Sequence, residues 1–181
     1  MCRIVLVLFI SIPYSLFPVP LLLAHETGFP EQTLKKVFPE ASGFTGRKKT
    51  LTPDQLKQAE QQSGSKVERN DNPLSYYVAL DKSSVALGTV LMLDARGPKG
   101  GLDLAVGISR DGTVHRVVVV ENKDDPNLSS AAFLDQIQGK SIKSPLKVGQ
   151  DIHYSGDSKS AQAFLNAVRR GLSLLAAAEG K

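Results

Sequence analysis

Four stretches of apolar or β-branched residues between positions 76 and 120 constrain the fold of this chain more than any other feature. They cover residues 76–80, 85–93, 104–108 and 114–120. The pair Asp111-Gly112 lies between the last two stretches and is a strong signal for a tight β-hairpin. Polar turn residues or glycines also separate the other stretches. The pattern therefore predicts four strands in an antiparallel meander.

Three helices are predicted outside these strands. A short one is expected over 31–41, and a second should begin at Thr52, where a hydroxyl cap precedes Pro53 and the capping-box residue Gln55. That second helix should end near Gly64. The last helix carries apolar residues three and four positions apart, the spacing of one buried stripe. Its stripe consists of Ala161, Phe164, Leu165, Val168, Leu172 and Leu175.

Two more segments are assigned from their polar residues. Ser129 or Ser130 is predicted to cap a further helix that reaches Gln138-Gly139. The stretch 42–50 is polar and contains glycine and lysine, so we predict a linker there. Helices attached to an antiparallel meander place the chain in the α+β class.

The N-terminus has the features of an export signal. Arg3 precedes an apolar run over 4–23, and Ala24 precedes polar residues that begin at His25. Three prolines would interrupt the second half of this run as a membrane-spanning helix. We predict cleavage near His25, with a retained N-terminal anchor as the alternative. The expected segments are 1–24 (signal peptide or anchor), 25–50 (helix and linker) and 51–181 (main domain).

Composition narrows the functions that remain. The formal net charge is +4, and the charges are scattered, so the clustered basic footprint of a nucleic-acid-binding protein is missing. Cys2 is the only cysteine and lies in the predicted export segment, which leaves the mature chain without a disulfide or a cysteine ligand. His25, His115 and His153 lack the spacing of metal ligands. We therefore expect neither a metal site nor nucleic-acid binding.

The other charged pairs are expected to face water. Asp124 and Asp125 are adjacent in a turn, so their side chains should point apart into solvent. Arg169 and Arg170 are expected on the solvated face of the last helix. None of these residues forms a recognisable catalytic set, and we predict no catalytic residue.

One loop has the pattern of a phosphate site. The glycine- and serine-containing segment 155–160 leads directly into the last helix. Free backbone N–H groups and the positive end of a helix dipole favour an anion at such a place, and Lys159 would add a cation. The simpler alternative is that Asp157 or Ser158 caps the helix.

The same loop carries a resemblance to a known family. Residues 154–160 resemble the Ser-Gly-Ala-Thr-x-Thr/Ser signature of the FMN-binding domain family. That family includes the periplasmic-side flavin subunits of sodium-translocating NADH:quinone reductase and of the related ferredoxin:NAD reductase complex. Segments 33–41 and 133–141 and the Asp111-Gly112 hairpin resemble other parts of the family in the same order. The resemblance covers nearly all of residues 29–175.

The resemblance implies a cofactor, a site and partners. The hydroxyl at the position of Ser158 is esterified to the FMN phosphate in that family by a separate flavin transferase. The chain would then carry electrons in the periplasm or another extracytoplasmic space, next to a membrane redox protein or complex. The residues expected at the cofactor are Ser155, Gly156, Asp157, Ser158, Lys159, Ser160, Pro126 and Leu128.

Two departures from the family pattern keep a second function open. Asp157 replaces the alanine of the signature and puts a carboxylate beside the expected phosphate. The Thr-Pro-Gly-Leu-Gly loop of the family corresponds to residues 125–129, which keep Pro126 and Leu128 but have neither glycine. The alternative is a binding or interaction module that keeps the fold and has lost the flavin. An independent flavin reductase is less favoured, because no nicotinamide-binding fingerprint is present.

Overall fold

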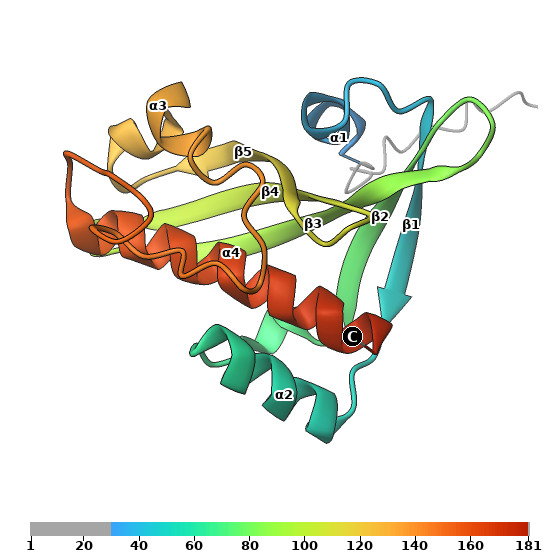
Figure 1. The fold of residues 1–181 in the computed structure, drawn as a ribbon, viewed down its shortest axis with the longest axis horizontal. Coiled ribbons are helices and arrows are strands. Elements are labelled where there is room, and N and C mark those ends of the chain that lie inside the picture. Colours follow the sequence, from blue (N-terminus) through green and yellow to red (C-terminus); the bar gives the residue numbers. More distant parts are fainter. Residues whose placement is uncertain (1–29, 181) are drawn as a thin grey trace, which may run out of the picture.

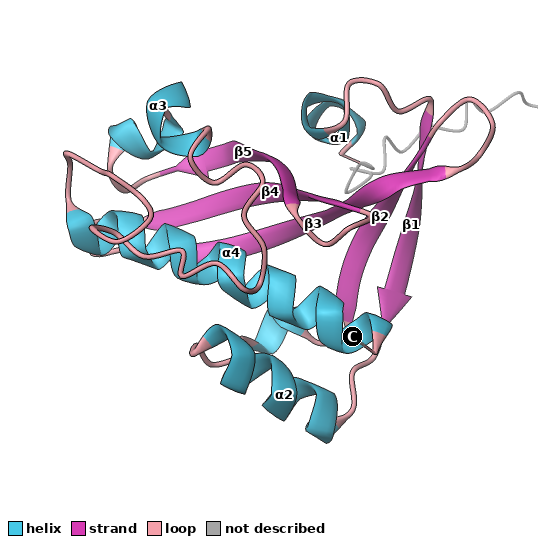
Figure 2. Ribbon diagram, in the orientation of Figure 1, coloured by secondary structure: helices cyan, strands magenta, loops and turns pink. Residues whose placement is uncertain are grey.

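Five antiparallel strands form the centre of the protein in a computed structural model that describes residues 30–180. The strands are β1 (Gly43–Lys49), β2 (Leu74–Leu80), β3 (Ala86–Arg96), β4 (Gly101–Ser109) and β5 (Val114–Asn122). They are neighbours in chain order, so the sheet is a meander (Figure 2). The four predicted strands and the α+β class are confirmed.

The hairpin between β4 and β5 forms where the sequence predicts it. Gly112 has a φ of +83°, in the left-handed region that glycine enters at little cost. The Ser109 N–H donates to the Thr113 carbonyl at 2.8 Å and closes the turn. Asp111 reinforces the turn by accepting hydrogen bonds from the backbone and the hydroxyl of Thr113.

The prediction of a linker over 42–50 is wrong. This stretch contains β1, which pairs with β2 in a register running from Gly43 opposite Leu80 to Lys49 opposite Leu74. Its sequence, with two glycines and three consecutive cations, lacks the apolar alternation of a half-buried strand. An edge strand needs mainly backbone hydrogen bonds to one neighbour, so it can form without that alternation.

Within the described part of the chain, four α-helices and two short 3₁₀ helices surround the sheet. They are α1 (Glu31–Val37), α2 (Pro53–Ser63), η1 (Arg69–Asp71), η2 (Pro126–Ser129), α3 (Ala131–Leu134) and α4 (Ser158–Glu179). The predicted capping box is present at the start of α2, where Thr52 and Gln55 each accept a hydrogen bond from the other's backbone N–H. Gly64 ends this helix in the left-handed conformation.

The sheet is covered on both faces by helices of very different length. The apolar stripe of α4 is buried against one face, together with Leu91, Leu93 and Leu104. On the opposite face, α1 packs on Val90 and Ala105 in a smaller cluster. Figure 1 shows α4 running along the sheet, with α1 on the other side and α2 against α4.

The helix predicted from Ser129 or Ser130 to Gln138-Gly139 is only partly formed. The chain instead makes η2, then the single-turn helix α3, then turns up to residue 139. Ser130 is the N-cap residue of α3, but its side chain makes no cap hydrogen bond. Phe133 and Ile137 are buried, so the segment is anchored by two core side chains rather than by helix length.

Within residues 30–180, no helix is both long and apolar enough to cross a membrane. The predicted signal peptide or anchor at 1–24, with Cys2 and His25, lies outside the described residues.

Shortening one side chain of the α4 stripe should weaken the fold strongly. Leu165 is completely buried, so Leu165→Ala should lower the free energy of unfolding by about 2–5 kcal/mol through lost transfer energy and a residual cavity. Chemical denaturation followed by circular dichroism measures the effect. Lys159→Ala, at an exposed position of the same helix, is the control and should change stability by less than about 0.5 kcal/mol.

Candidate functional site

Asp157 is the N-cap of α4. Its Oδ1 accepts hydrogen bonds from the backbone N–H groups of Lys159 at 2.8 Å and Ser160 at 3.3 Å. A carboxylate in this position satisfies donors that a helix otherwise leaves free and interacts favourably with the helix dipole. The capping alternative is therefore the correct one for Asp157, and these two N–H groups are already used by the chain itself.

The serines around this cap differ in exposure. Ser158 is the first residue of α4 and is exposed, as are Ser155 and Lys159. Ser160 is fully buried. Of the two hydroxyls within the helix start, only that of Ser158 is therefore accessible to a reagent or another protein.

Asp124 and Asp125 are buried directly behind this loop, so the expectation that they face water is wrong. Their exposed fractions are 9% and 5%. Asp125 Oδ2 accepts from the Asp157 N–H at 3.0 Å, and its Oδ1 accepts from the Asn127 N–H at 3.1 Å. Asp125 thus ties the loop before α4 to the start of η2. Backbone donors replace the water that these carboxylates lose on folding.

Asp124 ties a different segment to the same place. Its Oδ2 accepts from the N–H groups of Lys99 at 2.8 Å and Gly100 at 3.0 Å, in the turn between β3 and β4. A Cβ on Gly97 would collide with this oxygen, so a side chain there would displace the Asp124 carboxylate from its two donors. The two neighbouring carboxylates therefore hold two separate loops around the start of α4.

The donors around these carboxylates keep them ionised. The Asp157 N–H, the Tyr154 hydroxyl and the Asn127 N–H hold the pKa of Asp125 below its ordinary value. Burial works to raise the pKa of Asp124, but the Ser160 hydroxyl and the two turn N–H groups outweigh it and leave that pKa lowered. The hydroxyls of Tyr154 and Ser160 lie beside the carboxylates without a hydrogen bond of good geometry to any described residue.

Tyr154 supports the loop with its ring and places its hydroxyl beside the carboxylates. Burial first, and then the neighbouring Asp125 carboxylate, raise the pKa of its hydroxyl well above the ordinary value. Its ring meets Phe133 edge to face, with 4.9 Å between centroids. A Cβ on Gly156 would come within 2.5 Å of Asp125 and 2.6 Å of the Tyr154 ring, which explains the glycine in the signature.

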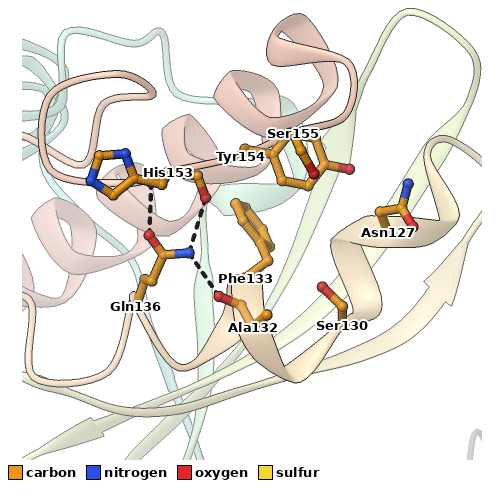
Figure 3. Close-up of a pocket in the computed structure, with 8 residues that line it drawn as sticks. All are labelled: Asn127, Ser130, Ala132, Phe133, Gln136, His153, Tyr154 and Ser155. Carbon is orange, nitrogen blue, oxygen red and sulfur yellow. Dashed lines mark hydrogen bonds between the residues drawn. The ribbon is translucent and has the colours of Figure 1, made fainter.

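Gln136 fixes the segment that leads into the loop. Its side-chain Nε2 donates to the His153 carbonyl at 2.9 Å, and its Oε1 accepts from the His153 N–H at 2.7 Å (Figure 3). The amide side chain thus imitates a β-bridge to one residue. This clamp fixes the backbone two residues before Ser155.

A surface pocket of about 500 Å³ opens between this clamp and η2. Phe133, Tyr154 and Ser155 line it, with Asn127 and Ser130 on the opposite side (Figure 3). It combines the half-buried ring of Tyr154 with hydroxyl and amide groups, and it adjoins the loop that carries Ser158. Such a mixed lining suits a ligand with a planar ring and polar edges.

The other two predicted cofactor residues differ in exposure. Pro126 is exposed at the first position of η2, on the surface near the pocket. Leu128 is completely buried and belongs to the hydrophobic core below the loop. The structure therefore gathers residues 155–160 and Pro126 around the start of α4 and puts Leu128 beneath them.

Arg170 and His115 do not add to the site. Arg170 is buried, not solvated as expected, and pairs with Glu68 at 2.8 Å and with Asp71 at 2.9 Å. His115 stacks on Phe38 with 4.3 Å between ring centroids, whereas His153 is exposed. Among the described residues, no group of three potential ligands is placed to hold a metal ion.

Known proteins support the resemblance found in the sequence. No protein-family model matches the chain. It is 26% identical over 159 residues to an ion-translocating oxidoreductase complex subunit of Methanosarcina acetivorans, covering 83% of this chain and 77% of that protein. The crystal structure of Shewanella oneidensis NqrC has the same fold, with a TM-score of 0.50 at 14% identity, over 77% of this chain and 82% of that one.

Loss of the Gln136 clamp should loosen the backbone at His153. We expect Gln136→Ala to speed hydrogen exchange of the His153 amide about tenfold, because this amide loses its hydrogen bond to the Gln136 side-chain oxygen. Exchange measured by NMR gives this rate directly. Gln138→Ala, at a nearby exposed position, is the control. An unchanged rate at His153 would show that Gln136 does not fix this segment.

Acid should weaken the loop through Asp125. Its folded pKa is lowered, so its contribution to stability is present above the unfolded pKa and is lost as pH falls through the folded value. Asp125→Asn should therefore lower the melting temperature more at pH 7 than at pH 3, measured by thermal scans.

Asp103 in β4 offers a control of opposite sign. Burial first, and then the Asp94 and Glu121 carboxylates, raise its pKa, so its ionised form destabilises the fold as pH rises. Relative to the parent protein, Asp103→Asn should raise the melting temperature more at pH 7 than at pH 3. The same direction of change in both variants would contradict the assignment of Asp125.

Proposed function

We propose that this chain is an exported FMN-carrying electron-transfer subunit. It resembles a subunit of an ion-translocating oxidoreductase complex in sequence, and it resembles NqrC in fold. FMN bound to it would supply transfer of one or two electrons. The observation that carries the proposal is the exposed Ser158 hydroxyl, at the first position of α4 and at the signature position of the family. We propose that the FMN phosphate is attached there.

The residues around Ser158 fit a phosphate ester in their chemistry. The hydroxyl is accessible, the first turn of a 22-residue helix favours an anion, and Lys159 is an exposed cation next to it. Formation of the ester would break the Ser158 O–H bond and make an Oγ–P bond. The donor would be an FMN whose phosphate is activated as an anhydride: the P–O bond of the anhydride would break, its other half would leave as a phosphate anion, and the Ser158 proton would pass to solvent.

The pocket beside Ser155 is the proposed place for the flavin ring. The half-buried Tyr154 ring, supported from below by the buried Phe133, would exclude water from one side of a planar ring, and Asn127 and Ser130 offer polar groups at the edge. Gln136 and Asp125 would act indirectly by fixing the two ends of the loop that carries the ring. Ser155, Gly156, Ser160, Pro126 and Leu128 shape the loop and its support.

We further propose where the subunit works. The N-terminal segment 1–24 would direct export or anchor the chain, which would place it on the extracytoplasmic side of a membrane redox complex. Its proposed partners are that complex and a flavin transferase. The name of the Methanosarcina relative, a subunit of an ion-translocating oxidoreductase complex, supports assembly with a larger complex.

A second function is favoured by one observation. The Asp157 carboxylate already occupies two N–H groups at the start of α4. A chain with this cap has no need of a phosphate to complete the helix, so a flavin-free interaction module is the alternative. The presence or absence of a covalent flavin on the purified protein separates the two functions.

Removal of the Ser158 hydroxyl should abolish attachment. After co-expression with an active flavin transferase, intact-protein mass spectrometry should show an FMN adduct on the parent and none on Ser158→Ala. Ser155→Ala should keep the adduct, because its hydroxyl is exposed but lies three residues before the helix position. A cooperative thermal transition of Ser158→Ala checks its fold. A parent protein without adduct, beside a loaded control substrate, would favour the interaction module.

A further inference from the structure

The turn between β3 and β4 is built against the start of α4. The backbone N–H groups of Lys99 and Gly100 donate to Asp124. The next residue, Asp125, accepts from the Asp157 N–H. Neither Gly97 nor Gly100 has room for a side chain, because a Cβ would collide with the Asp124 carboxylate in the first case and with the Lys123 carbonyl in the second. The position of the turn is therefore fixed relative to the loop before Ser158.

Negative charge accumulates at this place. Asp124, Asp125 and Asp157 are all within electrostatic range of Tyr154, and the first two are buried. A phosphodiester at Ser158 would add a fourth negative charge to this cluster. Such a concentration of like charge opposes attachment unless cations compensate it.

Lys99 is the cation that the turn brings to the cluster. Its side chain is exposed, and its positive charge contributes to lowering the pKa of both Asp124 and Asp125. Its backbone N–H donates to Asp124 Oδ2 at 2.8 Å, so the base of this exposed side chain is fixed next to the cluster.

We propose that Lys99 is a binding residue for the flavin phosphate, supplying from the β3–β4 turn the positive charge that offsets the phosphodiester among the three carboxylates. This inference rests on the proposed attachment at Ser158. The ligand class is an anionic phosphodiester of a flavin nucleotide. The turn would then be a second element of the site, separate in sequence from the signature loop by more than fifty residues.

A purely structural role for Lys99 makes a different prediction. If its charge only balances Asp124 and Asp125, its removal should destabilise the flavin-free and the flavin-loaded protein equally. If it also offsets the phosphate, its removal should cost more stability in the loaded protein. Comparing the two forms therefore isolates the interaction with the phosphate.

The test uses the full chain, loaded by a flavin transferase in a timed reaction at low salt. Lys99→Ala should lower the initial rate of FMN addition about two- to fivefold, the effect of one exposed charge pair, and Lys99→Arg should restore it. Lys82→Ala is the matched control, because Lys82 is exposed in the β2–β3 turn at the other end of β3. The melting temperatures of all four proteins are measured with and without flavin.

The outcomes distinguish the inference from the proposed function. The inference is supported if the parent takes up flavin and Lys99→Ala lowers the melting temperature more in the flavin-loaded form than in the flavin-free form. A slower rate with equal losses in both forms would assign Lys99 to docking of the transferase and overturn the phosphate contact. Equal rates and equal losses would overturn it as well. A parent that takes up no flavin would refute the attachment site itself, and the inference with it.

Discussion

The packing of α4 against the sheet is the interaction on which the rest of the structure depends. Its buried stripe runs from Ala161 to Leu175, so the helix position is set by the core and not by its ends. Gly171 allows close approach, since a Cβ there would lie 2.5 Å from Leu93. With the helix fixed, its first turn is held at one end of the sheet, where Ser158 is presented to solvent.

The loops at that end are ordered by buried charge. Asp124 and Asp125 each accept two backbone N–H groups, and the donors come from the β3–β4 turn, η2 and the loop before α4. Loss of either carboxylate would leave two partly buried backbone N–H groups without these partners, which costs stability. The same charges that order the loops would oppose binding of an anionic cofactor, and the proposed role of Lys99 is to offset that repulsion.

Sequence patterns predicted the parts of the fold that depend on local signals. The capping box at Thr52, the Asp111-Gly112 turn and the stripe of α4 each involve residues close in the chain, and all three are present. The burial of Asp124 and Asp125 was missed because one donor to each carboxylate lies far along the chain, 25 residues from Asp124 and 32 residues from Asp125. Likewise, the two hydrogen bonds between Gln136 and His153 join residues 17 apart, although Gln136 belongs to a segment that the family resemblance had marked.

The composition of β1 has a consequence for how the protein behaves among copies of itself. This strand closes one side of the sheet, and its outer row of backbone groups faces away from β2. Arg47, Lys48 and Lys49 are all exposed along it. A second copy approaching to extend the sheet would bring its own three cations into the same row, and their repulsion disfavours that pairing. The residues that hid this strand from a pattern search thus protect an open sheet edge against aggregation.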